Sequence, residues 1–279
     1  MIKSVFQALF VILILGAGAG FSQSATPTPR PQVNRLENVR PLNDRDDTNF
    51  SRRTAPENLP PEYRVSSKAM KRTKFSDEEK LSYKNAKKND LKLLKIFVAP
   101  NCAAQFVIDV SDPRCAENFD YIPISYYSFF DGVYGQYFAE LRMIEGVLVA
   151  GSGRFVHGLL VDLGEADIGA LDKKSPEVIK FAGYTIAKTS DEADKQVEEL
   201  EKGINYEGDI LSSQKKIVPN HTYLMRIVAY ASPDEPMSPY NYDSIIAFQV
   251  AGLTDDGMVI LFWKKLSEKT APKLQKSKK

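Results

Sequence analysis

The residue types of a hydrolytic triad occur together in one short stretch of the sequence. Ser152 lies between two glycines, and His157 and Asp162 follow it. A nucleophile elbow needs glycines two positions before and two positions after the serine, on a strained strand-to-helix turn. Those positions hold Ala150 and Arg154, and the surrounding pattern is strand, turn, strand. We therefore interpret Ser152 as a loop residue and expect no catalytic site here.

Cofactor and metal motifs are equally weak. The glycines around Ser152 lack the third glycine and the following helix of a dinucleotide-binding motif, and no Walker-type phosphate loop occurs. The acidic clusters at 44–47 and 255–256 lack the ligand spacing of a calcium loop. His157 lies between apolar neighbours in an expected strand, where a histidine is usually a hydrogen-bonded structural residue. We predict no cofactor and no metal site.

The N-terminus has the three zones of a secretory signal peptide. Lys3 gives a positive start, residues 5–15 are apolar except for Gln7, and small residues follow at 16–20. Cleavage is expected near residues 19–22, which leaves an exported protein, periplasmic or extracellular. The alternative is an uncleaved membrane anchor, for which the stretch is at the short limit.

Export changes the interpretation of the two cysteines. Cys102 and Cys115 would lie in an oxidising compartment, where a pair of cysteines normally forms a disulfide. Asp112 and Pro113 form a turn signal that returns the chain toward Cys102. Two free thiols or half of a metal site are the alternatives. We predict a structural disulfide.

Aromatic residues are concentrated between 121 and 138. Exposed tyrosines can offer a flat amphipathic surface to a glycan or a protein. The candidate ligand-contact residues are Tyr126, Tyr127, Tyr134 and Tyr137. The alternative is that these residues pack across strands in the core, because aromatic residues are common strand formers.

The elements that must position these residues are mostly strands. We expect strands at 105–110, 121–130, 140–144, 147–150, 155–163, 181–187, 222–231, 244–253 and 258–263. Glu145 and Gly146 predict a hairpin turn. One helix is expected to start at Ser76, where Glu79 completes a capping box, and another to run from Ser190 to Gly203. The fold class is α+β, a predominantly antiparallel β-sheet with one or two packed helices, and continuous apolar runs indicate strands that are covered on both faces.

The charge is divided sharply along the chain. Residues 23–95 hold 17 basic and 10 acidic residues, residues 96–263 hold 12 and 25, and residues 264–279 hold 7 and 1. The near-zero net charge of the whole chain is therefore the sum of an acidic body and two basic arms. Such a net charge gives no argument for nucleic-acid binding. The predicted organisation is a signal peptide (1–22), a disordered Pro-rich basic tether (23–74), a helical lead-in (75–95), an acidic α+β domain (96–266) and a disordered basic tail (267–279).

The expected function is that of an exported, envelope-associated binding or structural protein without catalytic activity. The arms would contact an anionic envelope polymer or lipid head groups. They could instead be merely solvated, or they could fold back on the acidic body. The alternative function is a secreted hydrolase whose site is assembled from distant strands. A closed pocket holding a perturbed carboxylate beside His157 would favour that enzyme.

Overall fold

The computed structural model describes residues 65–84, 90–104, 107–135, 139–153, 156–231 and 241–275. All of them belong to one compact unit, Asn49–Lys279. The predicted signal peptide and residues 23–64 of the predicted tether lie outside the described residues.

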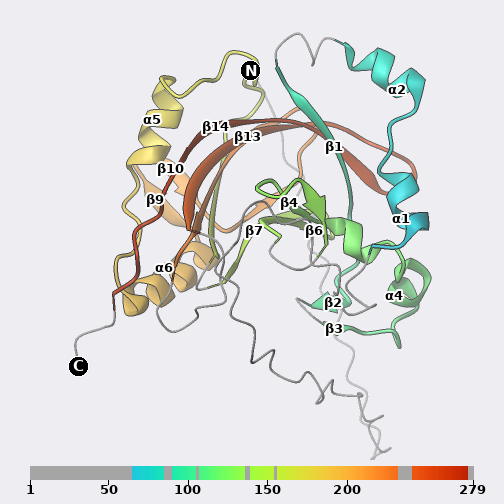
Figure 1. The fold of residues 1–279 in the computed structure, drawn as a ribbon, viewed down its shortest axis with the longest axis horizontal. Coiled ribbons are helices and arrows are strands. Elements are labelled where there is room, and N and C mark those ends of the chain that lie inside the picture. Colours follow the sequence, from blue (N-terminus) through green and yellow to red (C-terminus); the bar gives the residue numbers. More distant parts are fainter. Residues whose placement is uncertain are drawn as a thin grey trace, which may run out of the picture. The chain divides into compact units, whose positions relative to one another are not determined.

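A large antiparallel sheet dominates the described part of the chain (Figure 1). Within the described ranges, ten strands pair in the order β1-β14-β13-β12-β8-β7-β6-β4-β5, with β11 pairing to β7. These strands are β1 (Lys92–Phe97), β4 (Tyr126–Ser128), β5 (Val133–Tyr134), β6 (Leu141–Ile144), β7 (Val147–Gly153), β8 (Val156–Asp162), β11 (Gln214–Lys216), β12 (Thr222–Ala229), β13 (Tyr242–Leu253) and β14 (Met258–Lys269). Two further pairs form separate two-stranded sheets. They are β2 (Ala103–Ala104) with β3 (Val107–Ile108) and β9 (Ile204–Tyr206) with β10 (Asp209–Leu211). The expected mostly antiparallel sheet is confirmed, and it is accompanied by a few helices where one or two were expected.

The sheet is curved into a half-barrel whose two ends approach each other. Past the end of β1, Ala99 donates a hydrogen bond to the Met143 carbonyl at 3.0 Å and accepts one from the Glu145 amide at 2.9 Å. Residues of strands far apart in the sheet order meet inside the curve, where the ring centres of Phe129 and Trp263 are 4.9 Å apart. The concave face therefore encloses a packed core, in which apolar side chains from both limbs of the sheet contact one another.

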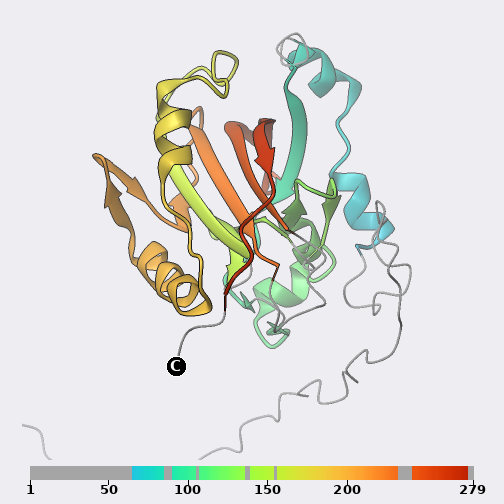
Figure 2. The ribbon, with the colours of Figure 1, turned by 60° about the vertical axis from the view of Figure 1, so that its left-hand side comes forward.

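Helices cover the convex face of the sheet (Figure 2). The two are α5 (Pro176–Gly183) and α6 (Ser190–Lys202), which bury Phe181 and Leu200 against the sheet. β12 lies between the two layers, and all eight of its residues are buried. This confirms the expectation that continuous apolar runs form strands covered on both sides.

Shorter helices lie N-terminal to and beside β1. They are α1 (Ser67–Arg72), α2 (Asp77–Ser82), α4 (Pro113–Asn118) and the 3-10 helix η2 (Ile122–Ser125). The capping box of Ser76 and Glu79 begins α2 as predicted. No helix in the described ranges is both long enough and apolar enough to cross a membrane.

One strand prediction is wrong and a second is wrong in part. Residues 181–187 do not form a strand: Pro176 begins α5, and Val178 and Phe181, one helical turn apart, are buried against the sheet. The expected strand at 121–130 is reduced to β4, because residues 122–125 form η2, with Pro123 near its start. Proline lacks the amide hydrogen that a strand would need there.

The boundaries of the folded body also differ from the prediction. Ser67–Arg72 forms α1 with Ala69 fully buried, so the tether does not extend to residue 74. At the other end β14 continues to Lys269, and Ala271 and Leu274 are buried against Val228 and its neighbours, so the fold extends past residue 266. Thr189, not Ser190, caps α6, while Gly203 ends the helix with φ of 86° as expected.

Candidate functional site

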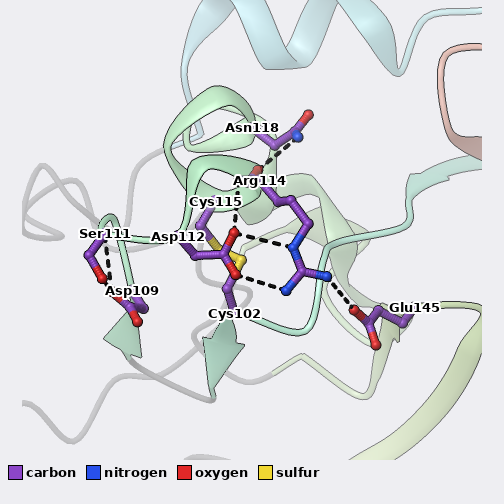
Figure 3. The surroundings of a disulfide bond; sticks show 8 residues. All are labelled: Cys102, Asp109, Ser111, Asp112, Arg114, Cys115, Asn118 and Glu145. Carbon is purple, nitrogen blue, oxygen red and sulfur yellow. Dashed lines mark hydrogen bonds and ion pairs between the residues drawn. A yellow bond between two sulfur atoms is a disulfide. The ribbon is translucent and has the colours of Figure 1, made fainter.

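The predicted disulfide is present. Cys102 and Cys115 are bonded across a sequence separation of 13 residues. Figure 3 shows the bond beneath α4, whose first residues follow the predicted turn at Asp112 and Pro113. The Asp112 side chain caps the helix by accepting a hydrogen bond from the Arg114 amide at 2.9 Å. A disulfide of this kind is compatible with an exported protein.

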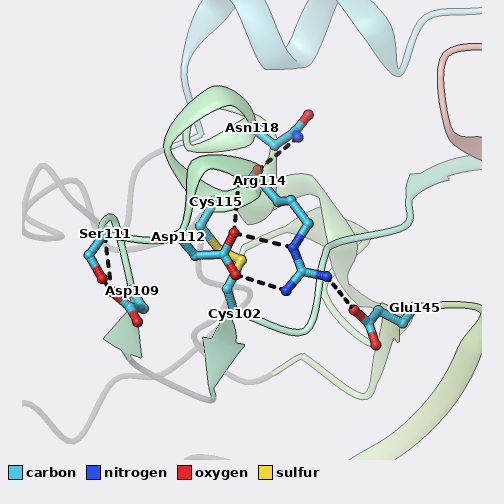
Figure 4. Close-up of polar contacts among 8 residues, drawn as sticks. All are labelled: Cys102, Asp109, Ser111, Asp112, Arg114, Cys115, Asn118 and Glu145. Carbon is cyan, nitrogen blue, oxygen red and sulfur yellow. Dashed lines mark hydrogen bonds and ion pairs between the residues drawn. A yellow bond between two sulfur atoms is a disulfide. The ribbon is translucent and has the colours of Figure 1, made fainter.

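Arg114 connects this disulfide loop to the sheet. Its guanidinium donates to Asp112 at 2.8 Å and to Glu145, in the β6–β7 turn, at 3.1 Å (Figure 4). The hydrogen bonds from Arg114 hold the pKa of Asp112 below its ordinary value. Arg114 is largely exposed, so these ion pairs contribute little stability individually. Arg114 thus links the disulfide loop to the turn between β6 and β7.

The candidate aromatic residues are distributed between the core and its margin. Tyr126 and Tyr127 are buried, with 3% and 8% of their surfaces exposed, and burial raises the pKa of Tyr127 to about 12. Tyr134 is half-buried, and its hydroxyl donates to the Lys95 carbonyl. Tyr137 lies outside the described residues. Tyr126 and Tyr127 are therefore core residues and cannot contribute to an exposed ligand-contact face.

The residues of the possible triad are not assembled. β7 runs through Ser152, and the next element is β8 rather than a helix. Asp162 pairs instead with His221, whose Nδ1 lies 3.0 Å from its Oδ1. His157 is buried with its ring edge-to-face against Tyr230, at 4.9 Å between ring centres.

Glu140 is a buried carboxylate that the sequence did not single out. It accepts hydrogen bonds from the amides of Phe129 and Phe130, at 3.0 Å for Phe130, and from the hydroxyl of Tyr242. Burial raises its pKa from 4.5 to about 7, although all three hydrogen bonds act in the opposite direction. The Glu140 side chain ties the turn after β4 to β13.

A small pocket lies on the convex side of the sheet, between α6 and the paired strands β7 and β8. Its volume is about 110 Å³, and its polar lining includes Arg142, His157, Glu201 and Gln214. The carboxylate beside His157 is thus Glu201; Glu140, whose pKa is shifted, does not line this pocket. The arrangement that would favour the hydrolase does not occur at His157.

Two glycines allow the backbones of β7 and β8 to approach closely at this pocket. A Cβ atom on Gly158 would lie 2.1 Å from the Ala150 carbonyl carbon, and one on Gly151 would lie 2.4 Å from the Val156 carbonyl oxygen. Only glycine fits such an approach. Gly151, directly before Ser152, therefore has a packing role, in line with the absence of a nucleophile elbow.

Sequence reasoning missed Glu140 and Arg142. Both stand in the apolar stretch 139–144, where a charged residue within a strand is the available signal. The search of protein-family models, of curated proteins and of solved structures found no match to this chain.

Proposed function

We propose that the protein is an exported, envelope-associated binding protein. Its basic segments would hold it against an anionic surface. The observation that carries this proposal is the position of those segments relative to each other. They are far apart in sequence and are separated by the acidic body.

Strand pairing brings the folded ends of the two basic segments together. β1, at the end of the first segment, pairs with β14 so that Lys92 lies opposite Trp263, directly before Lys264 and Lys265. The Lys92 ammonium lies 4.7 Å from the Trp263 ring centre. Tyr83, preceding the exposed Lys84, packs on Phe262 of β14 at 5.2 Å between ring centres.

We call the exposed lysines Lys84, Lys92 and Lys265 the basic corner; Lys265 also forms an ion pair with Glu268. Positive charge gathered at one corner of an otherwise acidic body would orient the protein on a negatively charged surface. The disulfide supports the export that this role requires, because such bonds persist in oxidising compartments.

The experiment measures retention of the chain without residues 1–22 on phosphatidylglycerol vesicles, with phosphatidylcholine vesicles as the neutral surface. We expect retention on the anionic vesicles alone, weakening as salt is raised, because exposed charges are screened. Each lysine near an anionic membrane contributes about 1 kcal/mol, so changing the basic corner to glutamine should weaken retention by about two orders of magnitude. Purified cell-wall material, tested in parallel, distinguishes an anionic polymer from lipid head groups.

The matched control changes three exposed lysines elsewhere on the body, Lys173, Lys174 and Lys195, to glutamine. It removes the same net charge and should leave retention largely intact. No salt-dependent retention on any anionic surface would overturn the proposed function. Equal losses in the two variants would overturn the role of the basic corner.

A further inference from the structure

The pocket beside α6 is lined by Arg142, whose guanidinium includes a buried donor. The Nε atom of Arg142 is buried and makes no hydrogen bond to any described residue, while the Tyr126 hydroxyl, opposite on β4, interacts with the same guanidinium. A guanidinium N–H that is withdrawn from water without an acceptor is costly. Arg142 lines the pocket, so a ligand oxygen there would supply an acceptor to its guanidinium.

The strand register explains why Arg142 faces this pocket. Arg142 pairs with Val149 of β7, which in turn pairs with Gln214 of β11. Its neighbours Leu141 and Met143 belong to the core on the concave face, so alternation along β6 directs Arg142 to the convex face. Arg142 and Gln214 thus lie on the same face, next to α6.

The second charged group of the pocket comes from α6. Glu201 lines the same cavity as Arg142, and the structure shows no ion pair between these two side chains. The pocket therefore presents a positive and a negative group that do not neutralise each other by direct contact. An anion alone would meet the unfavourable charge of Glu201, and a cation alone would meet that of Arg142.

Size restricts the ligand further. The cavity measures about 110 Å³. A cavity of roughly 150 Å³ is enough for benzene, so this one suits a ligand core of about five heavy atoms. A guanidinium is the preferred partner of a carboxylate, and a carboxylate accepts hydrogen bonds from an ammonium group.

We propose that this pocket binds a small α-amino acid, with its carboxylate on Arg142 and its ammonium group on Glu201. Gln214, from β11, offers an amide to the remaining polar atoms. The walls contributed by Val197 and Leu200 leave room for only a small side chain, as in glycine or alanine. This site is distinct from the basic corner, and neither proposal depends on the other.

The test is calorimetric titration of the disulfide-intact chain with glycine, alanine, acetate, ethylamine and inorganic phosphate. We expect saturable binding of glycine and alanine, at least tenfold weaker binding of acetate, and no binding of ethylamine or phosphate. Changing Arg142 to Met should weaken alanine binding at least tenfold. Changing Glu201 to Gln should weaken alanine binding, because the ammonium group loses its partner, and should strengthen acetate binding, because the charge that opposes a lone anion is removed.

Two controls separate the site from general effects on charge and fold. Glu198→Gln, at an exposed position of the same helix, and Arg114→Met, in the disulfide loop, should leave alanine binding unchanged. If Arg142→Met does not fold, Arg142→Lys tests the same contact while keeping the charge. Absence of saturable amino-acid binding, tighter binding of phosphate than of glycine, or equal loss of alanine and acetate binding in Glu201→Gln would overturn the proposal.

Discussion

Two charged residues in the same short stretch of chain have opposite surroundings. Glu140 is fully enclosed, and its carboxylate receives two backbone amides and the hydroxyl of Tyr242. Arg142, two residues later, has a buried Nε that makes no hydrogen bond to any described residue, and its guanidinium interacts with the hydroxyl of Tyr126. A buried charge that is completely hydrogen-bonded holds the fold together, whereas an incompletely bonded one beside a cavity is available to a ligand. Substitutions at the two positions test this difference, and the largest effect is expected at Glu140.

Removing the Glu140 side chain should destabilise the protein severely. Glu140→Ala leaves two backbone amides and one tyrosine hydroxyl buried without an acceptor. We expect the free energy of unfolding at pH 7 to fall by about 3 kcal/mol or more. Urea unfolding measures the change. Glu198→Ala, at an exposed position on α6, should stay within about 0.5 kcal/mol of the wild type. A similarly small effect of Glu140→Ala would remove the contrast with Arg142.

The contribution of Glu140 to the free energy of unfolding should fall as the pH rises, which is opposite to the behaviour of most carboxylates. Its pKa in the folded state, about 7, lies above the ordinary value of 4.5, so the folded protein binds the proton more tightly than the unfolded chain. The stabilising contribution is complete below pH 4.5 and is lost as the pH rises through 7.

The Glu140→Gln variant isolates this contribution. Glutamine resembles the protonated acid, since it can accept from the two amides and donate to Tyr242, but it does not titrate. Between pH 4.5 and 7.5 the stability of the wild type relative to this variant should fall by up to about 3 kcal/mol. Urea unfolding of both proteins at several pH values gives this difference. Parallel pH profiles would show that Glu140 does not titrate in this range.

Arg142 should give the smallest effect on stability. Arg142→Met removes the unbonded Nε donor together with the interaction between the guanidinium and the Tyr126 hydroxyl, and it fills the space with a flexible apolar side chain. We expect the free energy of unfolding to be unchanged or raised, within about 1 kcal/mol, when no ligand is present. Saturating alanine should then stabilise the wild type and leave the variant unaffected. A loss above roughly 2 kcal/mol would show that Arg142 is structural, as Glu140 is.

Features encoded by neighbouring residues could be predicted from the sequence. The capping box of Ser76 and Glu79 begins α2, and Glu145 and Gly146 form the turn between β6 and β7. The disulfide could be predicted because the chain has only two cysteines. The apolar run of β12 predicted burial on both faces, and the structure confirms it. In each case a few adjacent side chains carry the whole signal.

Features that depend on distant residues could not be predicted. Residues 181–187 contain strand-forming types, but Phe181 belongs to α5 because the sheet offers an apolar surface to a helix there. The aromatic stretch does not itself say which of its side chains turn inward, and Tyr126 and Tyr127 are core residues. The basic corner exists because β1 pairs with β14, at the opposite end of the chain.

The amino-acid sequence by itself determined the period of the strands, the starts of α2 and α6 to within a residue, the cysteine pair and the separation of acidic from basic segments. Each of these follows from residue type and short spacing. Only the tertiary structure decided the difference between Glu140 and Arg142. The hydroxyl that satisfies Glu140 comes from Tyr242, 102 residues away, and the pocket beside Arg142 exists because α6 covers that face of the sheet. Whether a buried charge is satisfied depends on which groups the fold brings within hydrogen-bonding distance, and local sequence does not contain that information.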